Sequence, residues 1–342
     1  SLVGGAGDDT FTYLSDTSAA NGLEATDTVT GGKGNDTLAL TVGSVDIGAS
    51  GTNIVLTGVT GVETITITNT DADDAYITLT DGQFVTAAAA SLSGNGTTAA
   101  IVGVVDGSSS TGAGVIVLDG SAEDDSKMII TGGAGNDTHL KPTGLDTIIG
   151  GAGNDIYYMD DAIANQIEIT TTFTTGATNP DKLAIDVSDY NSASEGTDIT
   201  TSTDLSGTNV YVSIVSLGAN GNTYDISGSM VGGTTLVIEF TGLTNDANYD
   251  VSATGQTDGT ALFAALAPAT DTQTIASLTV DSGAAFYIVA IDATTGDAGV
   301  WFADAGNGNT IVTAAEVLPV AMIADVTLTD GSFTYDNFTL VD

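Results

Sequence analysis

The sequence predicts an all-β protein, in which a parallel β-solenoid is followed by antiparallel β-rich domains with one or two short helices. Two patterns predict this class. Nonapeptide segments rich in Gly and Asp recur between positions 1 and 160, and such repeats are typical of solenoids. Elsewhere, short runs of Val, Ile and Thr are separated by turns of Gly, Asp, Ser and Asn, which is the pattern of half-buried strands.

The composition agrees with a folded but strongly acidic chain. Its 342 residues are 42% hydrophobic, which is too apolar for a disordered acidic tail, and this length suggests roughly two domains. Acidic residues number 44 against 4 basic ones, so the formal net charge is −40. A halophile-like solvated surface is one explanation. The other is that carboxylate and carbonyl oxygens bind divalent cations, in loops that the 44 glycines would allow. Composition leaves both explanations open, and the spacing of the repeats decides between them.

The repeats fit the pattern G-G-x-G-x-D-x-U-x, where U is a large apolar residue. Four segments match it, and they begin at Gly4, Gly31, Gly132 and Gly150. The first two starts are three nonapeptides apart and the last two are two nonapeptides apart. Within each cluster the units therefore keep one nine-residue register. Two degenerate units, at 22–30 and 141–149, keep this register and place Asp27 and Asp146 at the Asp position.

This spacing has a direct physical meaning. The first six positions of a unit form a turn that needs positive φ angles and close backbone approach, hence the glycines. The last three form a short strand with the apolar side chain inside. Two units complete one circuit, so every second turn stacks on the same side, and the Asp side chains of stacked turns face each other across a gap lined with carbonyls. Hard cations such as Ca²⁺ prefer these oxygen ligands.

At these residues the sequence resembles the RTX family, the hemolysin-type calcium-binding repeats of bacterial proteins exported by type I secretion. It is most similar to RTX-type S-layer and surface proteins. The resemblance implies a parallel β-roll with Ca²⁺ between stacked turns, in a protein at the cell surface. Carried over, the Asp ligands of the second cluster are Asp137 and Asp155, with carbonyls near Gly132, Ala134, Gly150 and Ala152. Asp9 and Asp36 occupy the matching position in the first cluster, while Asp27 and Asp146 match that position alone.

We expect residues 1–160 to form the repeat domain, with units at 4–12, 31–39 and 132–158. Strands are expected between them at 54–57, 62–68, 75–79, 99–105, 114–118 and 128–131. The block 41–131 is either a run of solenoid strands without repeats or an inserted β-sandwich. His139 stands where the family prefers Leu, Ile or Phe, so it is expected to be structural. Acidic clusters at 71–74 and 123–125 are either solvated turns or additional Ca²⁺ sites.

Two further β-rich regions are expected, at 161–280 and 281–342. Longer alternating strands at 166–175, 209–217, 234–242, 285–291 and 299–303 favour antiparallel sheets. Residues 259–266 read as a short helix, and a capping box from Thr313 to Glu316 predicts another through about Ile323, which Pro319 should shorten or kink. Residues 336–342 resemble a type I secretion signal and also fit a terminal strand.

Several function classes are excluded. Four Lys and Arg residues cannot neutralise a nucleic-acid backbone or attach the chain to anionic lipid. No apolar window is long enough to cross a bilayer, so membrane insertion by a helix is not expected. The chain has no Cys and one His, and no catalytic motif is present, so we expect no enzyme.

The leading functional hypothesis is a calcium-dependent, secreted bacterial surface protein with a structural role, of which this chain is a fragment. It would self-associate into an S-layer-like lattice or a filament, with cell-surface polysaccharide as a second candidate partner. The alternative is the C-terminal calcium-binding and secretion module of a large RTX adhesin or of an extracellular enzyme.

Overall fold

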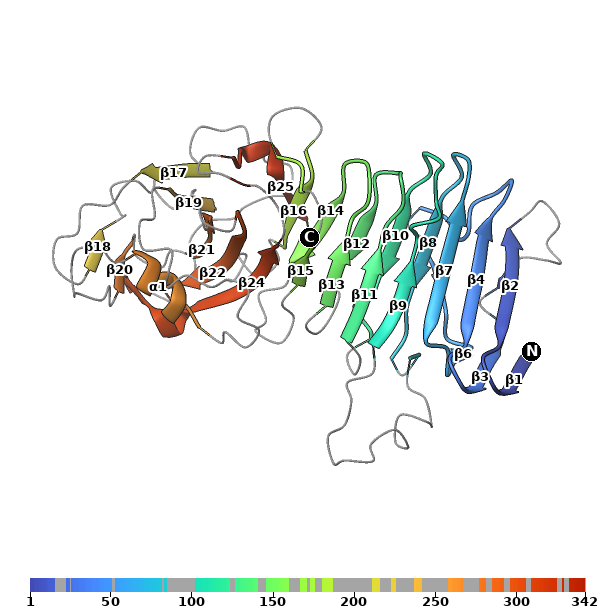
Figure 1. Ribbon diagram of the computed structural model, residues 1–342. Helices are drawn as coiled ribbons and strands as arrows, with labels where there is room; N and C mark the ends of the chain where they lie inside the picture. The colour runs from blue at the N-terminus through green and yellow to red at the C-terminus, as the bar shows by residue number, and fades with distance from the viewer. Residues whose placement is uncertain are drawn as a thin grey trace. The chain divides into compact units, whose positions relative to one another are not determined.

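The structure is a computed structural model (Figure 1). It describes residues 1–15, 23–24, 26–50, 53–81, 83–84, 102–123, 127–140, 146–159, 167–170, 173–175, 180–186, 211–215, 223–225, 237–241, 258–266, 277–280, 285–291, 296–305, 309–324, 328 and 332–341. These residues form two compact units, Ser1–Tyr158 (unit 1) and Met159–Asp342 (unit 2). The described part of the chain is nearly all β, as the sequence predicts, with one short α-helix.

Unit 1 is built from parallel strands in three sheets. The first sheet runs in the order β13 (Asp146–Ile149), β11 (Lys127–Thr131), β9 (Val102–Asp106), β7 (Thr64–Asn69), β4 (Thr37–Val42) and β2 (Thr10–Ser15). The second contains β14 (Ile156–Met159), β12 (Thr138–Leu140), β10 (Ile116–Asp119), β8 (Ala75–Thr78) and β5 (Ile54–Val55). The third joins β1 (Leu2–Ala6), β3 (Val29–Lys33) and β6 (Val59–Thr60).

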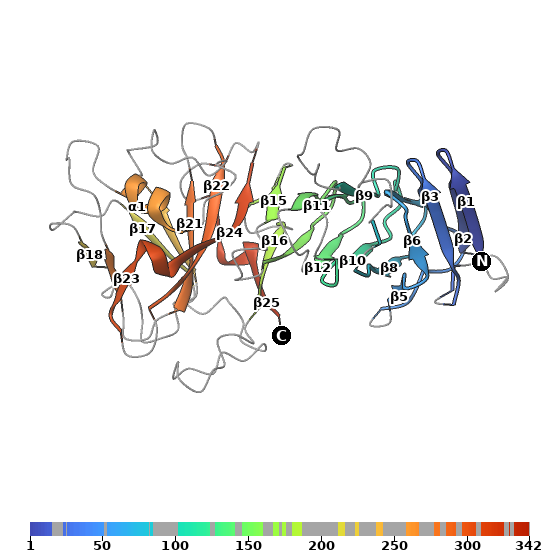
Figure 2. The same ribbon diagram turned by 90° about the horizontal axis from the view of Figure 1, so that it is seen from below.

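The chain passes repeatedly between the first and second sheets. From β7 to β14, consecutive strands belong alternately to the two sheets, and each pairs in parallel with the previous strand of its own sheet. Figure 2 shows β9 and β11 in one layer and β8, β10 and β12 in another. Strands of the block 41–131 pair with strands on both sides of it, β7 with β4 and β11 with β13.

Alternating side chains fill the space between these layers. In β4 the buried residues are Leu38, Leu40 and Val42, and the residues between them are half-buried. β7 continues this pattern with Ile65 and Ile67, which lie beside Leu38 and Leu40 in register. Because successive strand side chains point to opposite faces, each strand contributes every second residue to the core.

His139 occupies one of these inward positions. It pairs in register with Leu118 on one side and Tyr157 on the other, its ring lies 5.6 Å from that of Tyr157, and it is 1% exposed. Neither ring nitrogen has a hydrogen-bond partner among the described residues. Burial lowers the pKa of His139 to about 4, so the ring packs as a neutral group where the repeats place an apolar residue.

Unit 2 has a sheet of mixed direction. Its strands follow the order β17 (Tyr211–Val215), β19 (Val237–Thr241), β21 (Ala285–Ile291), β22 (Ala298–Asp304), β24 (Val317–Ile323) and β15 (Ile167–Ile169). β22 is antiparallel to both β21 and β24, whereas the other pairs in this run are parallel. The expectation of antiparallel sheets is therefore wrong for much of this unit, because alternation predicts which face is buried but not which way a neighbouring strand runs.

Smaller pairings complete unit 2. β18 (Thr223–Asp225) is parallel to β20 (Ser277–Thr279), which is antiparallel to β23 (Ile311–Thr313). After the 3₁₀-helix η5 (Tyr335–Asn337), β25 (Phe338–Val341) pairs in parallel with β16 (Lys182–Asp186). The Asn337 amide donates to the carbonyls of Thr174 and Asp181. Among the described residues, no helix has the length and apolarity that a membrane span requires.

One of the two predicted helices is present. The structure confirms the first as α1 (Thr260–Leu266), whose Leu262, Phe263 and Leu266 pack into a core that includes Trp301. The second prediction is wrong, since a single 3₁₀ turn, η4 (Ala314–Glu316), leads directly into β24.

The capping interaction that suggested the second helix does form. Glu316 Oε2 accepts hydrogen bonds from the backbone N–H of Thr313 at 2.7 Å and from its hydroxyl at 2.8 Å. Pro319 lies opposite Trp301, next to a register shift between β22 and β24. Proline is tolerated at such bulges and breaks helices, so the apolar run after Glu316 forms a strand.

Replacing His139 by Leu should stabilise unit 1, and the gain should grow in acid. The pKa of His139 is about 4 in the folded chain and an ordinary 6.5 in the unfolded chain. Between these two pH values the unfolded chain therefore binds a proton at this residue that the folded chain does not bind. Stability from this group is therefore present above pH 6.5 and is lost as the pH falls towards 4. The stability difference between variant and wild type should widen by about 3 kcal/mol over that range, measured by urea unfolding. Carboxylate titrations common to both chains cancel, and a constant difference would contradict the assignment.

Candidate metal centre

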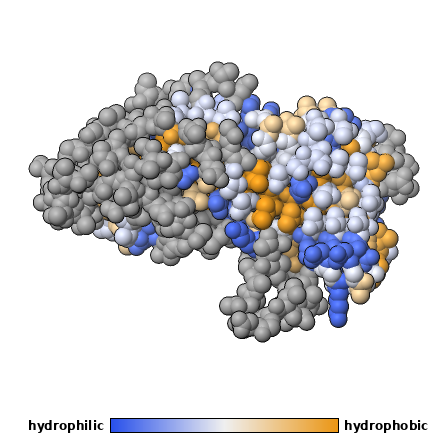
Figure 3. All heavy atoms as spheres, viewed as in Figure 1, coloured by the Kyte–Doolittle hydropathy of each residue, from blue (hydrophilic) through white to orange (hydrophobic). Residues whose placement is uncertain are grey.

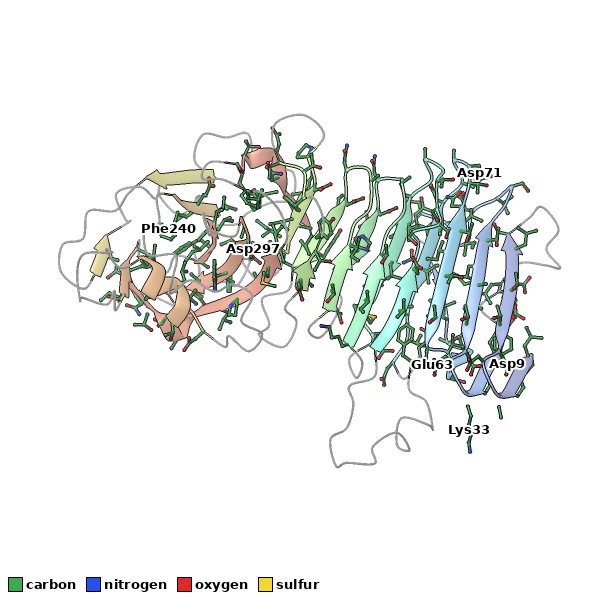
Figure 4. All side chains as sticks on the ribbon, in the orientation of Figure 1. Asp9, Lys33, Glu63, Asp71, Phe240 and Asp297 are labelled. Carbon is green, nitrogen blue, oxygen red and sulfur yellow. The ribbon has the colours of Figure 1, made fainter. Side chains whose placement is uncertain are left out.

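Three carboxylates stand in a row where the chain enters the first sheet. One carboxylate comes immediately before each of three neighbouring strands: Asp9 before β2, Asp36 before β4 and Glu63 before β7. The first residues of these three strands are partners in register. Figure 4 shows Asp9 and Glu63 at the same edge of unit 1, with Asp71 at the opposite edge. In Figure 3, hydrophilic residues gather at this lower edge. Asp9 and Asp36 are three nonapeptides apart, like the two repeat units that contain them. Glu63 follows Asp36 at the same spacing.

Asp36 and Glu63 each accept a backbone hydrogen bond from the preceding residue of the row. Asp36 Oδ1 accepts the Asp9 N–H at 2.8 Å, and Glu63 Oε2 accepts the Asp36 N–H at 2.7 Å. Asp36 is fully buried, while Asp9 and Glu63 are half-buried. Charge-assisted bonds of this kind are stronger than neutral ones, so the row fastens neighbouring turns together.

The remaining oxygens of the row are the feature that suggests a cation. Asp9 Oδ2, Asp36 Oδ2 and Glu63 Oε1 are buried and have no hydrogen-bond partner within the described part of the chain. Backbone carbonyls approach the same places: a Cβ added to Gly31 would overlap both Asp36 Oδ2 and the carbonyl oxygen of Gly61. At Gly4 the added atom would meet Asp9 Oδ2 and the carbonyl of Gly31.

Converging anionic and carbonyl oxygens are costly to bury unless something positive lies between them. Burial raises the pKa of Glu63 and the nearby charge of Asp36 adds to it, although the hydrogen bond from the Asp36 backbone opposes the rise. Oxygen-only sites of this kind suit hard divalent cations, so these residues fit Ca²⁺.

Glycine makes the close stacking of these turns possible. Gly32 and Gly34 have φ angles of 120° and 138°, a region that other residues rarely adopt. A Cβ on either would overlap the carbonyl of Gly5 or Gly7 in the preceding turn. Beside them, Asp8 Oδ1 accepts the Asn35 N–H at 2.8 Å, which ties the turns a second time.

The second repeat cluster is stacked in the same way but is more fully hydrogen-bonded. Asp155 Oδ1 accepts the Asp137 N–H at 2.8 Å. Asp137 in turn accepts from Ile116 through Oδ1 at 2.7 Å and from Gly133 through Oδ2 at 2.6 Å. Burial raises the pKa of Asp137 to about 6, and these hydrogen bonds oppose the rise.

Of the predicted carbonyls of this cluster, that of Gly150 lies close to an Asp carboxylate, at Asp137 Oδ2. A Cβ on Gly132 would overlap Asp137 Oδ2 and the Gly150 carbonyl, and one on Gly150 would overlap Asp155 Oδ2 and the Tyr157 hydroxyl. Ala134 and Ala152 are exposed, and the Ala152 N–H donates to the Gly133 carbonyl at 2.9 Å.

The two weaker candidates have different surroundings. Asp146 begins β13 and is fully buried; its Oδ1 accepts the Met128 N–H at 2.6 Å, and its Oδ2 has no hydrogen-bond partner among described residues. Burial raises the pKa of Asp146 to about 7, despite Lys127. Asp27 lies in the turn before β3, where its Oδ2 accepts the Glu24 N–H at 3.0 Å, and the structure does not place it in the row of Asp9, Asp36 and Glu63.

Carboxylates outside the repeats also accept backbone N–H groups of neighbouring turns, at the edge where the chain enters the second sheet. Asp46 Oδ1 accepts the Asp74 N–H, and Asp74 Oδ1 accepts the Val115 N–H, both at 2.8 Å. The neighbouring Asp73 has a raised pKa, chiefly through desolvation and then through the charge of Asp71. Of the other acidic cluster, Glu123 is buried, and residues 124–125 lie outside the described residues.

Sequence reasoning missed Glu63 and Asp46, and it named Asp74 only as a member of the acidic cluster at 71–74. Glu63 could have been found by continuing the step from Asp9 to Asp36 once more along the chain and accepting Glu for Asp. Asp46 and Asp74 carry no repeat signal. No group of three or more His, Cys, Asp or Glu side chains that could hold a metal is found in the described ranges, so an ion at these turns would need backbone carbonyls as well.

No protein-family model matches the chain, and a search of curated proteins finds no match either. The likeness to RTX proteins therefore rests on the repeat residues of the sequence.

Replacing Asp146 by Asn should stabilise metal-free protein at pH 8. Asn keeps an oxygen for the Met128 N–H and removes a buried charge. Because the pKa is raised from 3.8 to about 7, the wild-type contribution is present below pH 3.8 and is lost as the pH rises through 7. We expect a gain on the order of 4 kcal/mol at pH 8 and almost none at pH 4, measured by urea unfolding in EGTA. Equal stabilities at pH 8 would show that this carboxylate is not strained by burial.

Proposed function

We propose that this chain is part of a calcium-dependent structural protein of the bacterial cell surface, exported by type I secretion. The observation that carries the proposal is the row of Asp9, Asp36 and Glu63, whose buried unbonded oxygens meet backbone carbonyls at stacked turns. The nonapeptide repeats and the net charge of −40 support the same conclusion.

We further propose that residues 1–160 are an RTX-type β-roll. Support comes from the alternation of parallel strands between two sheets. The repeat turns also stack, three nonapeptides apart in the first cluster and two apart in the second. In this interpretation the block 41–131 is a continuation of the solenoid, because its strands pair with β4 on one side and with β12 and β13 on the other.

Calcium would act as a folding switch. When bound, Ca²⁺ supplies the positive charge that buried carboxylates need. Without it, Asp9, Asp36 and Glu63 keep like charges close together and leave oxygens unsatisfied, which favours an extended chain fit for export. Extracellular modules bind Ca²⁺ with dissociation constants of about 10⁻⁴–10⁻³ M, so millimolar Ca²⁺ outside the cell would stabilise the fold through linkage.

Self-association into a lattice or filament is the structural role we propose. β1 and β2 are end strands of their sheets, and they expose the apolar side chains of Leu2, Val3 and Leu14. Exposed sheet edges readily pair with other strands. Cations that screen the acidic surface would permit such contacts.

Replacing Asp36 by Asn should reduce the stabilisation by Ca²⁺. Asn keeps one oxygen for the Asp9 N–H but removes the anionic oxygen beside the Gly61 carbonyl. The increase in melting temperature between EGTA and about 5 mM Ca²⁺, a concentration that saturates weak extracellular sites, should be smaller than in wild type. Asp81→Asn, at an exposed residue, is the matched control. An increase as large as in wild type would remove Asp36 from the proposed site.

Electron microscopy tests the assembly role. Ordered sheets or filaments that appear in Ca²⁺ and not in EGTA would support it. Compact single particles in Ca²⁺ would keep the calcium-dependent fold and favour the alternative, a calcium-binding and secretion module of an adhesin or enzyme. Identical melting in EGTA and Ca²⁺ would overturn the calcium proposal itself.

A further inference from the structure

The first sheet of unit 1 has an outer face that points away from the core. In β4 and β7 the residues between the buried positions are half-buried, and in β2 the matching residues are exposed. Because the strands β2, β4, β7, β9, β11 and β13 are paired in register, their outward residues line up in rows across the sheet (Figure 1). These rows make up the outer face.

Two rows of the outer face cross all six strands. The first row consists of Thr10, Thr37, Thr64, Val104, Ile129 and Thr147. The second row consists of Thr12, Ala39, Thr66, Asp106, Thr131 and Ile149. Figure 3 shows pale and hydrophobic residues over much of this face. Parallel sheets are usually covered on both faces, and threonine, valine and isoleucine pack well on a pleated surface.

Charge is scarce on the outer face and is placed symmetrically. Among the described outward residues of these strands, Asp106 and Lys127 are the charged ones. Asp106 ends β9 in the second row, and Lys127 begins β11 on the other side of the first row. The whole chain carries a net charge of −40, which drives copies apart. On the outer face the two opposite charges cancel, so two copies approach there with little repulsion.

The positions of the two charges suit a two-fold axis. An axis that lies between two outer faces and runs across the strands reverses the strand direction in the second copy. The first row then lies opposite itself, and Lys127 of each copy comes to the side where the other copy has Asp106. A partner of one charge sign could match only one of these groups, whereas a second copy matches both.

We propose that the outer face binds the outer face of a second copy of this chain, with the first rows in contact and Asp106 of each copy paired with Lys127 of the other. Sheets pack face to face at about 10 Å in this manner. The rows cover roughly 500 Å² of each copy, less than the ~800 Å² per partner of a standard interface, so an isolated pair should associate weakly. This inference rests on the self-association proposed above and assigns it a surface.

Charge reversal tests the contact. Asp106→Lys alone, or Lys127→Glu alone, places like charges at both pairs and should weaken dimer formation by about tenfold or more. An equimolar mixture of the two variants should associate as wild type does, because every pair then joins opposite charges. The measurement is sedimentation over a range of concentrations in about 5 mM Ca²⁺, which saturates weak extracellular sites. Asp81→Lys, at an exposed residue of the second sheet's turns, is the control and should associate as wild type does.

A second variant covers the case in which a reversal disturbs folding, since the charge of Lys127 also acts on Asp146. The chain has no cysteine, and Thr64 belongs to the first row, which faces itself in the dimer. A short bismaleimide should therefore cross-link Thr64→Cys into dimers. Ser121→Cys, at an exposed residue away from the outer face, should stay monomeric under the same treatment.

The outcomes separate this inference from the function on which it rests. Weakening by each reversal with recovery in the mixture supports the contact, because recovery between two chains cannot arise from an effect within one. A monomeric wild type, or a dimer that neither reversal weakens, overturns it. If such a chain still forms ordered sheets or filaments in Ca²⁺, the proposed function stands. If wild type neither dimerises nor assembles, both fail.

Discussion

The hydrogen bond from a backbone N–H to the carboxylate of a neighbouring turn is the interaction on which unit 1 depends. Parallel strands leave tight turns between sheets, and the buried N–H groups in those turns need acceptors. Asp36 accepts from Asp9 and Asp155 accepts from Asp137. This solution brings negative charge into the interior, where each carboxylate must find further partners. The acceptors that hold the turns together are therefore the same groups whose charge the proposed cation would balance.

The Asp side chains of the two repeat clusters differ in how many of their oxygens accept hydrogen bonds. Asp137 uses both carboxylate oxygens in hydrogen bonds to Ile116 and Gly133. Asp9 and Asp36 each retain one oxygen that no described residue satisfies. The consensus alone suggested that the second cluster held the best-formed site. In the first cluster the unpartnered oxygens stand in adjacent turns of one row, where the proposed cation would offset the cost of unsatisfied buried charge.

Local sequence signals predicted the structure correctly where no neighbouring strand was available to pair with the segment. The short helix at α1 formed as predicted, and Glu316 reached back to Thr313 as a capping box requires. The helix predicted after Thr313 did not form, because Pro319 fits beside the irregularity opposite Trp301 and the apolar run pairs in a sheet. His139 shows the converse, since a polar residue took an inward position because the register of Leu118 and Tyr157 left it no other.

The sequence by itself determined the all-β class, the approximate positions of most strands and the Asp residues of the repeat turns, because these depend on short-range patterns of glycine, charge and apolar alternation. The tertiary structure decided the direction of the strands in unit 2 and the roles of Glu63 and Asp74. Asp74 accepts from the distant Val115, and Glu63 accepts from Asp36 in the preceding turn of the stack. Such contacts depend on which strands become neighbours, and no local pattern encodes that choice.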